Sequence, residues 1–243
     1  YALSYGVKKH AWVLFVMASI VPALILTQTR SAWIGALAGV ASLILMRRPK
    51  AAFVLVTMVL AFYALSPTVI KERIRSGFDP TDPNTRNRIE LFQTAGRLIL
   101  DHPWLGVGPK NAKHEALKYR GSNEFPDWMY QHMHNNALQI AAETGVIGLM
   151  IWLWFMIRLA WDAWAVYRQA SRKPHPDFLA NAHKEAMMVS SAALAAWIAM
   201  MTAGMFEYNF GDSEILMLFM FIMSAPYVFA GSGCRQQEAI SSG

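Results

Sequence analysis

Two arginines and a histidine are the side chains of this sequence best suited to chemistry. Arg30 ends an apolar stretch, and Arg88 lies in a long polar segment. A guanidinium donates to two phosphate oxygens at once, so both arginines suit an anionic group. His134 lies two residues after His132, and a neutral histidine can accept a proton as a general base.

Each of these residues also has a simpler interpretation, which for His134 is that of an ordinary solvated loop histidine. Arg30 could lie at a membrane interface with its charge in water. Arg88 could pair with Asp79, Asp82 or Glu90, although its position three residues before an apolar helix face predicts that it points inward. Such a position requires an anionic partner.

The carboxylates of Glu207 and Asp212 lie in a short polar turn near the end of the chain. They could be solvated, with Asp212 capping a helix, or they could orient His134 or bind sugar hydroxyls. Lys110 could be solvated or could help to hold a phosphate. The alternatives stay open at this point.

The histidines do not predict a metal site. The only cysteine is Cys234, and no HExxH pattern or similar zinc-ligand spacing occurs. We therefore expect no metal ion and no cofactor.

The composition is that of an integral membrane protein. Of the 243 residues, 55% are hydrophobic and only 16% are charged, against about 25% charged in soluble domains. Because the chain begins at Tyr1 and shows no signal peptide, we expect it to be a piece of a longer protein. The net charge of +6 does not indicate nucleic acid, because the basic residues follow a membrane topology.

Six apolar segments approach the roughly 20 residues that a membrane-spanning helix needs. We predict an all-α bundle with spans at 12–27, 32–46, 51–70, 146–165, 187–206 and 214–230. Gly35 and Gly39 in the second span predict close packing against another helix.

The basic residues predict the orientation of these spans. Lysine and arginine gather before the first span, between the second and third, between the fourth and fifth, and after the sixth, so these connections are expected in the cytoplasm. The chain then divides into three spans (1–70), an extracytoplasmic loop (71–144), three spans (145–231) and a cytoplasmic polar tail (232–243).

The loop at 71–144 is expected to be helical and to cap the bundle. Apolar residues at Leu91, Phe92, Ala95, Leu98 and Ile99 follow one helix face, which predicts an amphipathic helix from Arg88 to Leu100. The other, polar face carries Glu90, Gln93, Thr94 and Arg97. Asn84 or Thr85 could cap it, and 101–103 ends it. A second helical pattern covers 134–142 and continues through Gly145 into the fourth span.

Four segments of the chain together resemble the O-antigen ligase family of bacterial membrane proteins. They are TQTRSAWIGALAG, RIELFQTAGRLILDHPWLGVGP, HMHNNALQIAAETGVIGL and FEYNFGDSE. The family also includes polysaccharide polymerases and protein O-oligosaccharyltransferases. The chain departs from the common pattern at Lys110, where glycine is frequent, and at Ala137, where an aromatic residue is frequent.

The resemblance implies a GT-C-like fold and a role for each candidate residue. Arg30 and Arg88 match arginines that engage the diphosphate of an undecaprenyl-linked glycan donor, and His134 matches the histidine that activates the acceptor. The residues assigned to substrate binding are Asn135, Lys110, His132, Glu207 and Asp212. The active site would face the periplasm from the bacterial inner membrane.

The expected reaction is a metal-independent, inverting glycan transfer. The acceptor could be lipid A-core, which makes a ligase and is favoured, or another lipid-linked glycan, which makes a polymerase. A transporter of lipid-linked glycans would need charged or helix-breaking residues within the spans. A non-catalytic scaffold would leave the inward Arg88 and the histidine motif without a purpose.

Overall fold

The computed structural model describes residues 11–121, 125–172 and 180–241, and these residues form helices, turns and loops without a strand. Apolar helices make up the bundle: α2 (Ala11–Leu26), α3 (Arg30–Arg47), α4 (Ala52–Leu65), α8 (Asn136–Arg172), α9 (Ala180–Ala203) and α10 (Ser213–Ser241). Shorter helices follow α4: α5 (Thr68–Arg75), α6 (Pro83–Asp101) and α7 (Ala112–Glu115). The predicted all-α class is confirmed.

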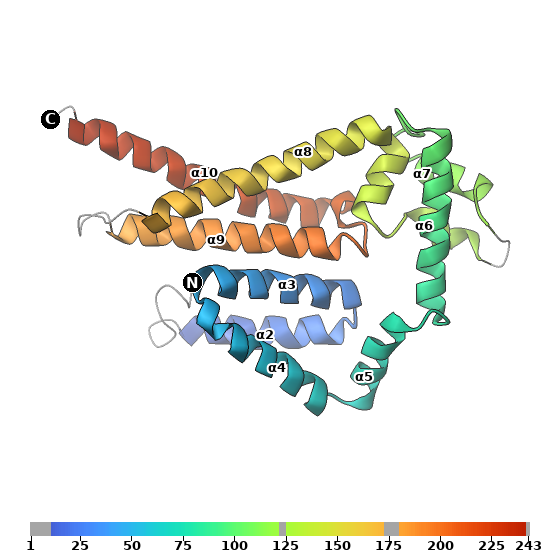
Figure 1. Cartoon of the computed structure of the whole chain (residues 1–243), viewed down its shortest axis with the longest axis horizontal. Coiled ribbons are helices and arrows are strands. Elements are labelled where there is room, and N and C mark those ends of the chain that lie inside the picture. Colours follow the sequence, from blue (N-terminus) through green and yellow to red (C-terminus); the bar gives the residue numbers. More distant parts are fainter. Residues whose placement is uncertain (1–10, 122–124, 173–179, 242–243) are drawn as a thin grey trace.

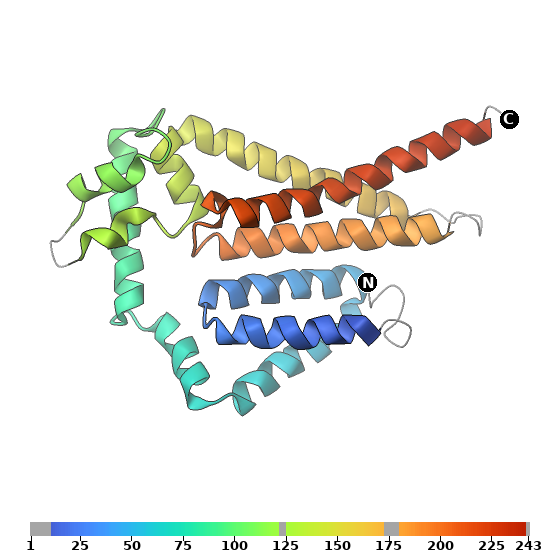
Figure 2. The ribbon, with the colours of Figure 1, turned by 180° about the vertical axis from the view of Figure 1, so that it is seen from behind.

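The helices of the bundle run alternately in opposite directions (Figure 1). Helices α3, α8 and α10 begin at the end of the bundle where α6 lies across it, and α2, α4 and α9 finish at that end. The view from behind shows α2, α3 and α9 side by side (Figure 2). The predicted cap over one end of the bundle is therefore present, and Arg30, Asn136 and Ala203 all lie near it.

Two helices are long and apolar enough to cross a membrane, Asn136–Ser171 and Ala182–Ala203. The pair Pro49–Leu65 and Thr68–Arg75 adds a third only as a broken span, since it bends by 113°. The apolar segments Phe15–Leu26 and Ser213–Phe229 are shorter. Among the described residues, these helices support a membrane protein but leave the predicted six spans unconfirmed.

The predicted third span is wrong at its C-terminal end. We expected one helix over 51–70, but α4 ends at Leu65 and α5 begins at Thr68. Pro67 disfavours helical backbone at the residue before it, and Ser66 is extended with φ −65° and ψ 144°. The chain turns there toward the cap.

Glycines bring α3 and α9 together, as the sequence predicts. A Cβ atom on Gly35 would lie 2.8 Å from the carbonyl oxygen of Ala199, and one on Gly39 would lie 2.9 Å from that of Ala195. Only glycine allows two helix backbones to approach this closely. This contact joins the N-terminal helices to the C-terminal ones.

Segment 71–144 has a hydrophobic core of its own. Leu91, Ala95 and Leu98 of α6 are buried against Tyr130 and Met133. The amphipathic helix is confirmed, but its predicted capping residue is wrong. Asp82 caps α6, because its carboxylate accepts hydrogen bonds from the N–H groups of residues 84 and 85. Pro83 follows it at the first helical position, which proline suits.

Part of the polar face of α6 is covered by another segment of the cap. Glu90 and Thr94 are buried, and Thr94 Oγ1 donates to Glu90 Oε1 at 3.1 Å. The same oxygen accepts from the N–H of Gly121 at 2.6 Å and from the hydroxyl of Tyr130 at 3.3 Å. Glu90 therefore ties α6 to the segment that leads to the histidines.

The loop after α6 docks on the first part of α8 through backbone contacts. The N–H groups of Val107 and Gly108 donate to the carbonyls of Ala142 and Glu143, each at 2.9 Å, and the N–H of Val146 donates to Pro103 at 2.7 Å. Here α8 kinks at Gly145, whose φ of 69° and ψ of −171° belong to glycine. The kink separates a short helix in the cap from the long membrane helix.

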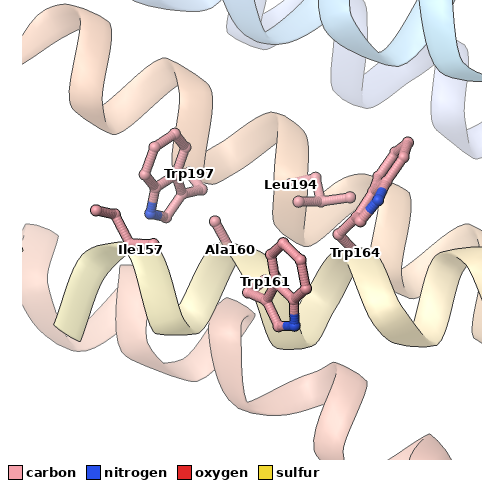
Figure 3. A pocket seen from close by; sticks show the side chains of 6 residues that line it. All are labelled: Ile157, Ala160, Trp161, Trp164, Leu194 and Trp197. Atoms are coloured by element: carbon pink, nitrogen blue, oxygen red, sulfur yellow. The ribbon is translucent and has the colours of Figure 1, made fainter. Parts of the chain in front are cut away.

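A hollow of about 280 Å³ lies on the membrane part of α8 and α9 (Figure 3). Its lining is apolar and includes Trp161, Trp164 and Trp197. These side chains suit contact with lipid, and they offer no acid or base. The candidate chemistry lies in the cap instead.

Candidate active site

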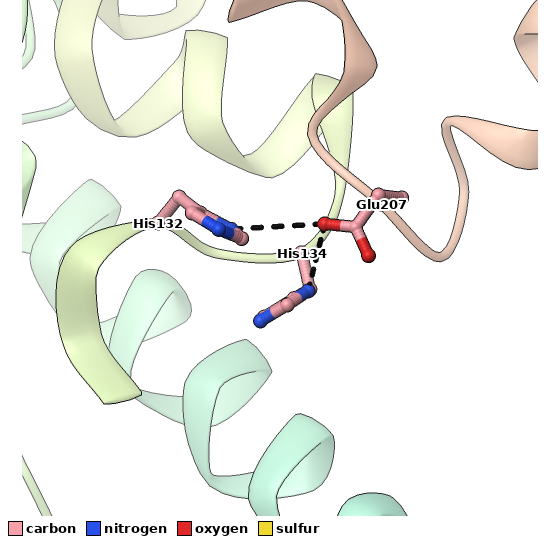
Figure 4. A group of neighbouring side chains, drawn as sticks. All are labelled: His132, His134 and Glu207. Carbon is pink, nitrogen blue, oxygen red and sulfur yellow. Dashed lines mark ion pairs between the residues drawn. The ribbon is translucent and has the colours of Figure 1, made fainter. Parts of the chain in front are cut away.

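His132, His134 and Glu207 converge beneath the cap (Figure 4). Nδ1 of His134 lies 2.9 Å from Oε1 of Glu207, and Nδ1 of His132 lies 3.9 Å from the same oxygen. The two imidazole rings are 4.2 Å apart between centroids. All three side chains are about a third exposed, so a substrate can reach them.

Neighbouring amides join the histidine loop to the turn that carries Glu207. The side-chain N–H of Asn135 donates to the carbonyl of Met205 at 2.9 Å. Asn136 donates its backbone N–H to Gly204 at 2.8 Å, and its side-chain oxygen accepts from the N–H of Phe210 at 3.0 Å. These bonds lie on both sides of Glu207 and hold it against His134.

The backbone aims the two histidines in one direction. His132 is extended, with φ −156° and ψ 161°, and in extended chain residues two apart lie on the same side. Met133 between them is fully buried, and its N–H donates to Gln139 at 2.8 Å. His134 has a φ of 45°, a conformation that is uncommon outside glycine and costs conformational energy.

The predicted helix over 134–142 therefore begins later than expected. Helix α8 starts at Asn136, and Asn135 accepts from the N–H of Leu138 at 3.0 Å in its first turn. His134 precedes the helix, so its side chain is free to face the Glu207 turn.

Arg88 is half-buried at the start of α6 and lies near Glu207, Arg30 and Arg73. Burial lowers the pKa of Arg88, and the positive charges of Arg30 and Arg73 lower it further, while Glu207 acts against them. Within the described part of the chain, no hydrogen bond or ion pair joins the Arg88 guanidinium to another residue. The alternative pairs with Asp79, Asp82 or Glu90 are absent there, and its donors are available.

Arg30, in contrast, is held by the turn before α6. It donates from Nη1 to Ser76 at 3.1 Å, and its Nη2 lies 3.7 Å from Asp82. Arg73 of α5 donates from Nε to the carbonyl of Gln28 at 3.2 Å. Arg30 and Arg73 therefore place two further positive charges close to Arg88.

The charges within the cluster are set by burial and by each other. Burial lowers the pKa of His132, and the neighbouring His134 lowers it further, against Glu207 and Asp212. Burial alone would raise the pKa of Glu207, but its contacts with His134 and with the N–H of Tyr208 bring it below its usual value. Glu207 is therefore an ionised carboxylate at neutral pH.

The same three side chains have the spacing of metal ligands. One donor atom each from His132, His134 and Glu207 lie within 4.8 Å of one another. The sequence did not predict this cluster because Glu207 is distant from the histidines along the chain. The expectation that the reaction needs no metal stays a prediction.

Comparison with known proteins assigns the chain to a family. A family model for O-antigen ligases matches residues 13–153, more than half of the chain. The chain belongs to the O-antigen ligase family. The resemblance seen in the sequence is therefore confirmed.

The chain is similar to three proteins from Rickettsia species, each named as a candidate polysaccharide ligase. Those of Rickettsia conorii and Rickettsia felis are 27% identical over 163 residues, and that of Rickettsia typhi is 26% identical over 162. Each alignment covers 62% of this chain and 39% of the relative. The chain thus matches about two fifths of the length of these relatives.

The O-antigen ligase match contains Arg30, Arg88, His132 and His134 but ends before Glu207. Lys110 is exposed in the loop after α6, and Asp212 is exposed but acts on His132 electrostatically. The amide of Asn135 is bonded to backbone at both of its ends. The substrate-binding roles of Lys110, Asn135 and Asp212 stay predictions.

The sequence did not identify three residues whose hydrogen bonds hold the segments of the candidate site in place: Glu90, Asn136 and Gln139. Asn136 and Gln139 lie in the histidine motif itself, and an amide in an otherwise apolar helix face is a signal of a buried hydrogen bond. Gln139 also donates to Glu143 at 2.7 Å. No pattern identified Glu90.

Proposed function

We propose that this chain forms the catalytic part of a membrane glycosyltransferase that moves a glycan from undecaprenyl diphosphate to an acceptor hydroxyl. The reaction would occur at the periplasmic face of the bacterial inner membrane, with a bundle of six spans below it. The ligase reaction, with lipid A-core as acceptor, is the form we favour. The observation that carries the proposal is the half-buried Arg88 beside the His134–Glu207 pair. Among the described residues its guanidinium makes no hydrogen bond or ion pair, and Glu207 acts on it only through its charge.

Arg88 is the residue we assign to the diphosphate. Its guanidinium has donors available, and a phosphate would supply the negative charge that Arg30 and Arg73 also attract. As the bond to the sugar breaks, charge develops on the leaving diphosphate, and fixed positive groups stabilise it there. Arg30 contributes charge while its contacts with Ser76 and Asp82 keep it in place.

His134 is the residue we assign to the acceptor. The ionised Glu207 at Nδ1 favours a proton on that nitrogen, which leaves Nε2 with the lone pair that a base requires. Nε2 takes the proton of the acceptor hydroxyl as its oxygen attacks the anomeric carbon from the face opposite the diphosphate. A single displacement of this kind inverts the configuration of that carbon and needs no metal ion.

The test compares variants of the full-length protein in membranes, with labelled undecaprenyl-diphosphate glycan and EDTA present throughout. Lipid A-core and a second lipid-linked glycan are offered separately as acceptors. We expect His134→Ala to lower the transfer rate by about 10²–10⁴-fold and Arg88→Ala by about 10²–10³-fold. The controls are His114→Ala and Arg120→Ala, since His114 is exposed and Arg120 makes a surface pair with Asp127.

The acceptor that is extended identifies the reaction. Transfer to lipid A-core makes the protein a ligase, and lengthening of the lipid-linked glycan makes it a polymerase. Folded Arg88→Ala protein with full activity would contradict the diphosphate role. No transfer to either acceptor, with His134→Ala indistinguishable from wild type, would favour transport or scaffolding instead.

A further inference from the structure

We propose that His132, His134 and Glu207 form a binding site for one divalent transition-metal ion of the Zn²⁺ class, and that a bound ion stops glycan transfer. The binding site stands on the arrangement of the three side chains. The inhibition rests on the proposed function, because it depends on His134 as the base.

The donor atoms lie within 4.8 Å of one another, slightly farther apart than around a bound zinc ion, so binding would draw the side chains closer together. Zinc binds imidazole nitrogen and carboxylate oxygen at about 2.0–2.2 Å with tetrahedral geometry, which places neighbouring donors about 3.3 Å apart. Oε1 of Glu207 lies 2.9 Å from one imidazole nitrogen and 3.9 Å from the other. Two histidines and one carboxylate leave a fourth position open for water or a substrate atom.

The surrounding contacts hold this arrangement without a metal ion. The N–H of Met133 is bonded to Gln139, and Asn135 and Asn136 fasten the histidine loop to Met205 and Gly204. These hydrogen bonds fix the two segments that carry the ligands, the loop with His132 and His134 and the turn with Glu207. Each ligand side chain is about a third exposed, while the Nδ1 atoms of His132 and His134 are buried without a hydrogen-bond partner. An ion would reach them by a small turn of the rings and would supply that partner.

Metal binding and base catalysis exclude each other at His134. The nitrogen that faces Glu207 is Nδ1. An ion on Nδ1 leaves the single proton of the neutral ring on Nε2, so Nε2 has no lone pair for the acceptor proton. Glu207 would also be engaged by the ion and could no longer hold a proton at Nδ1.

Substitution of Arg88 should change metal binding and glycan transfer in opposite directions. Its positive charge interacts with Glu207, so it repels a cation bound there. Arg88→Ala should therefore bind the ion severalfold more tightly, whereas it transfers glycan more slowly. A surface metal site far from Arg88 would not show this pair of effects.

The binding test uses the full-length protein in detergent, freed of metal, and titrates Zn²⁺ by calorimetry and Co²⁺ by its visible absorption. We expect one ion per site, with affinity lowered at least tenfold in His132→Ala and in Glu207→Gln. His114→Ala, which removes an exposed histidine elsewhere in the cap, should bind as wild type does. Binding that persists in both His132→Ala and Glu207→Gln overturns the site.

The activity test measures transfer with and without Zn²⁺, each variant relative to its own metal-free rate. We expect Zn²⁺ to inhibit wild type and EDTA to restore it, with inhibition shifted to at least tenfold higher Zn²⁺ in His132→Ala. If Zn²⁺ binds as expected across the variants but leaves transfer unchanged or accelerates it, the metal site stands and the proposed inhibition is wrong. A protein that binds Zn²⁺ as described but transfers no glycan keeps the site and overturns the proposed function.

Discussion

Glu207 contacts His134 from a turn that lies far along the chain, and its carboxylate is the negative charge nearest the imidazole (Figure 4). The sequence left three alternatives open for Glu207: orientation of His134, binding of sugar hydroxyls, or solvation alone. The distance of 2.9 Å favours the first. Sequence could not decide between them, because the contact depends on how two turns meet.

Glu207→Gln separates these roles. The substitution keeps the size of the side chain and removes the charge that favours a proton on Nδ1, so the transfer rate should fall by about 10²–10⁴-fold. The KM for the donor should change little, because the residue proposed to bind the diphosphate, Arg88, is unchanged. Steady-state kinetics with a labelled donor measure both. Glu214→Gln, which changes an exposed carboxylate at the start of α10, is the control and should leave both values unchanged.

Glu90 marks the limit of periodicity as a guide to single residues. The pattern of α6 assigned Glu90 and Thr94 to the polar face, and both are buried. A helical wheel separates apolar from polar residues, but it does not show that another loop with its own donors covers the polar face. Only the structure therefore shows that the polar face of α6 is also covered.

Glu90→Gln should destabilise the cap. One carboxylate oxygen accepts three hydrogen bonds, from Thr94, Gly121 and Tyr130. A neutral amide is a weaker acceptor, and we expect a loss of about 1–3 kcal/mol. Thermal unfolding in detergent should show a lower midpoint. Glu115→Gln, which removes an exposed pair with Lys118, should cost less than about 1 kcal/mol. Equal losses in the two variants would contradict the role of Glu90.

At the scale of elements, the loop after α6 and the start of α8 act as one unit. The sequence predicted the turn at 106–109 and the passage through Gly145. It did not predict that these two segments pack backbone against backbone, because no hydrophobic period describes such contact. A Cβ atom on Gly106 would lie 2.5 Å from the carbonyl carbon of Glu143, and one on Gly145 would overlap the carbonyl of Trp104.

Gly145→Ala should disrupt this unit. Its φ of 69° and ψ of −171° belong to a region that side chains avoid, which costs about 1–3 kcal/mol before the overlap with Trp104 is counted. We expect less folded protein in membranes and a lower unfolding temperature. Gly96→Ala is the matched control, because nothing lies within 4 Å of its added Cβ atom. Within α6 it should be neutral or slightly stabilising.

At the scale of the whole molecule, the contact between α3 and α9 sets how far Arg30 lies from Glu207. Arg30 begins α3, and α9 ends just before the turn that carries Glu207. The sequence predicted the small-residue packing but not its partner, because a glycine pattern does not name the helix that fits it. The order of helices in the bundle came from the structure.

Gly39→Leu should force α3 and α9 apart. The position admits no Cβ atom, since Ala195 and Ala199 lie within about 3 Å of it. We expect lower thermal stability and a loss of transfer, measured on protein purified from membranes. Val40→Leu adds a methylene at the next residue, which is exposed, and should change neither quantity. Full stability in Gly39→Leu would contradict the role of this contact.

The bundle as a whole makes a prediction about sidedness. Helices α3, α8 and α10 begin at the capped end, and α2, α4 and α9 finish there (Figure 1). If each crosses the membrane, Lys113 in α7 faces the periplasm and Lys50, between α3 and α4, faces the cytoplasm. In a Cys234→Ser background, a membrane-impermeant maleimide should label Lys113→Cys in spheroplasts. Lys50→Cys should react only after the membrane is opened. Equal labelling of both in sealed spheroplasts would mean that α4 does not cross the membrane between them, because α4 is bent into α5 near Pro67 and could turn back without crossing.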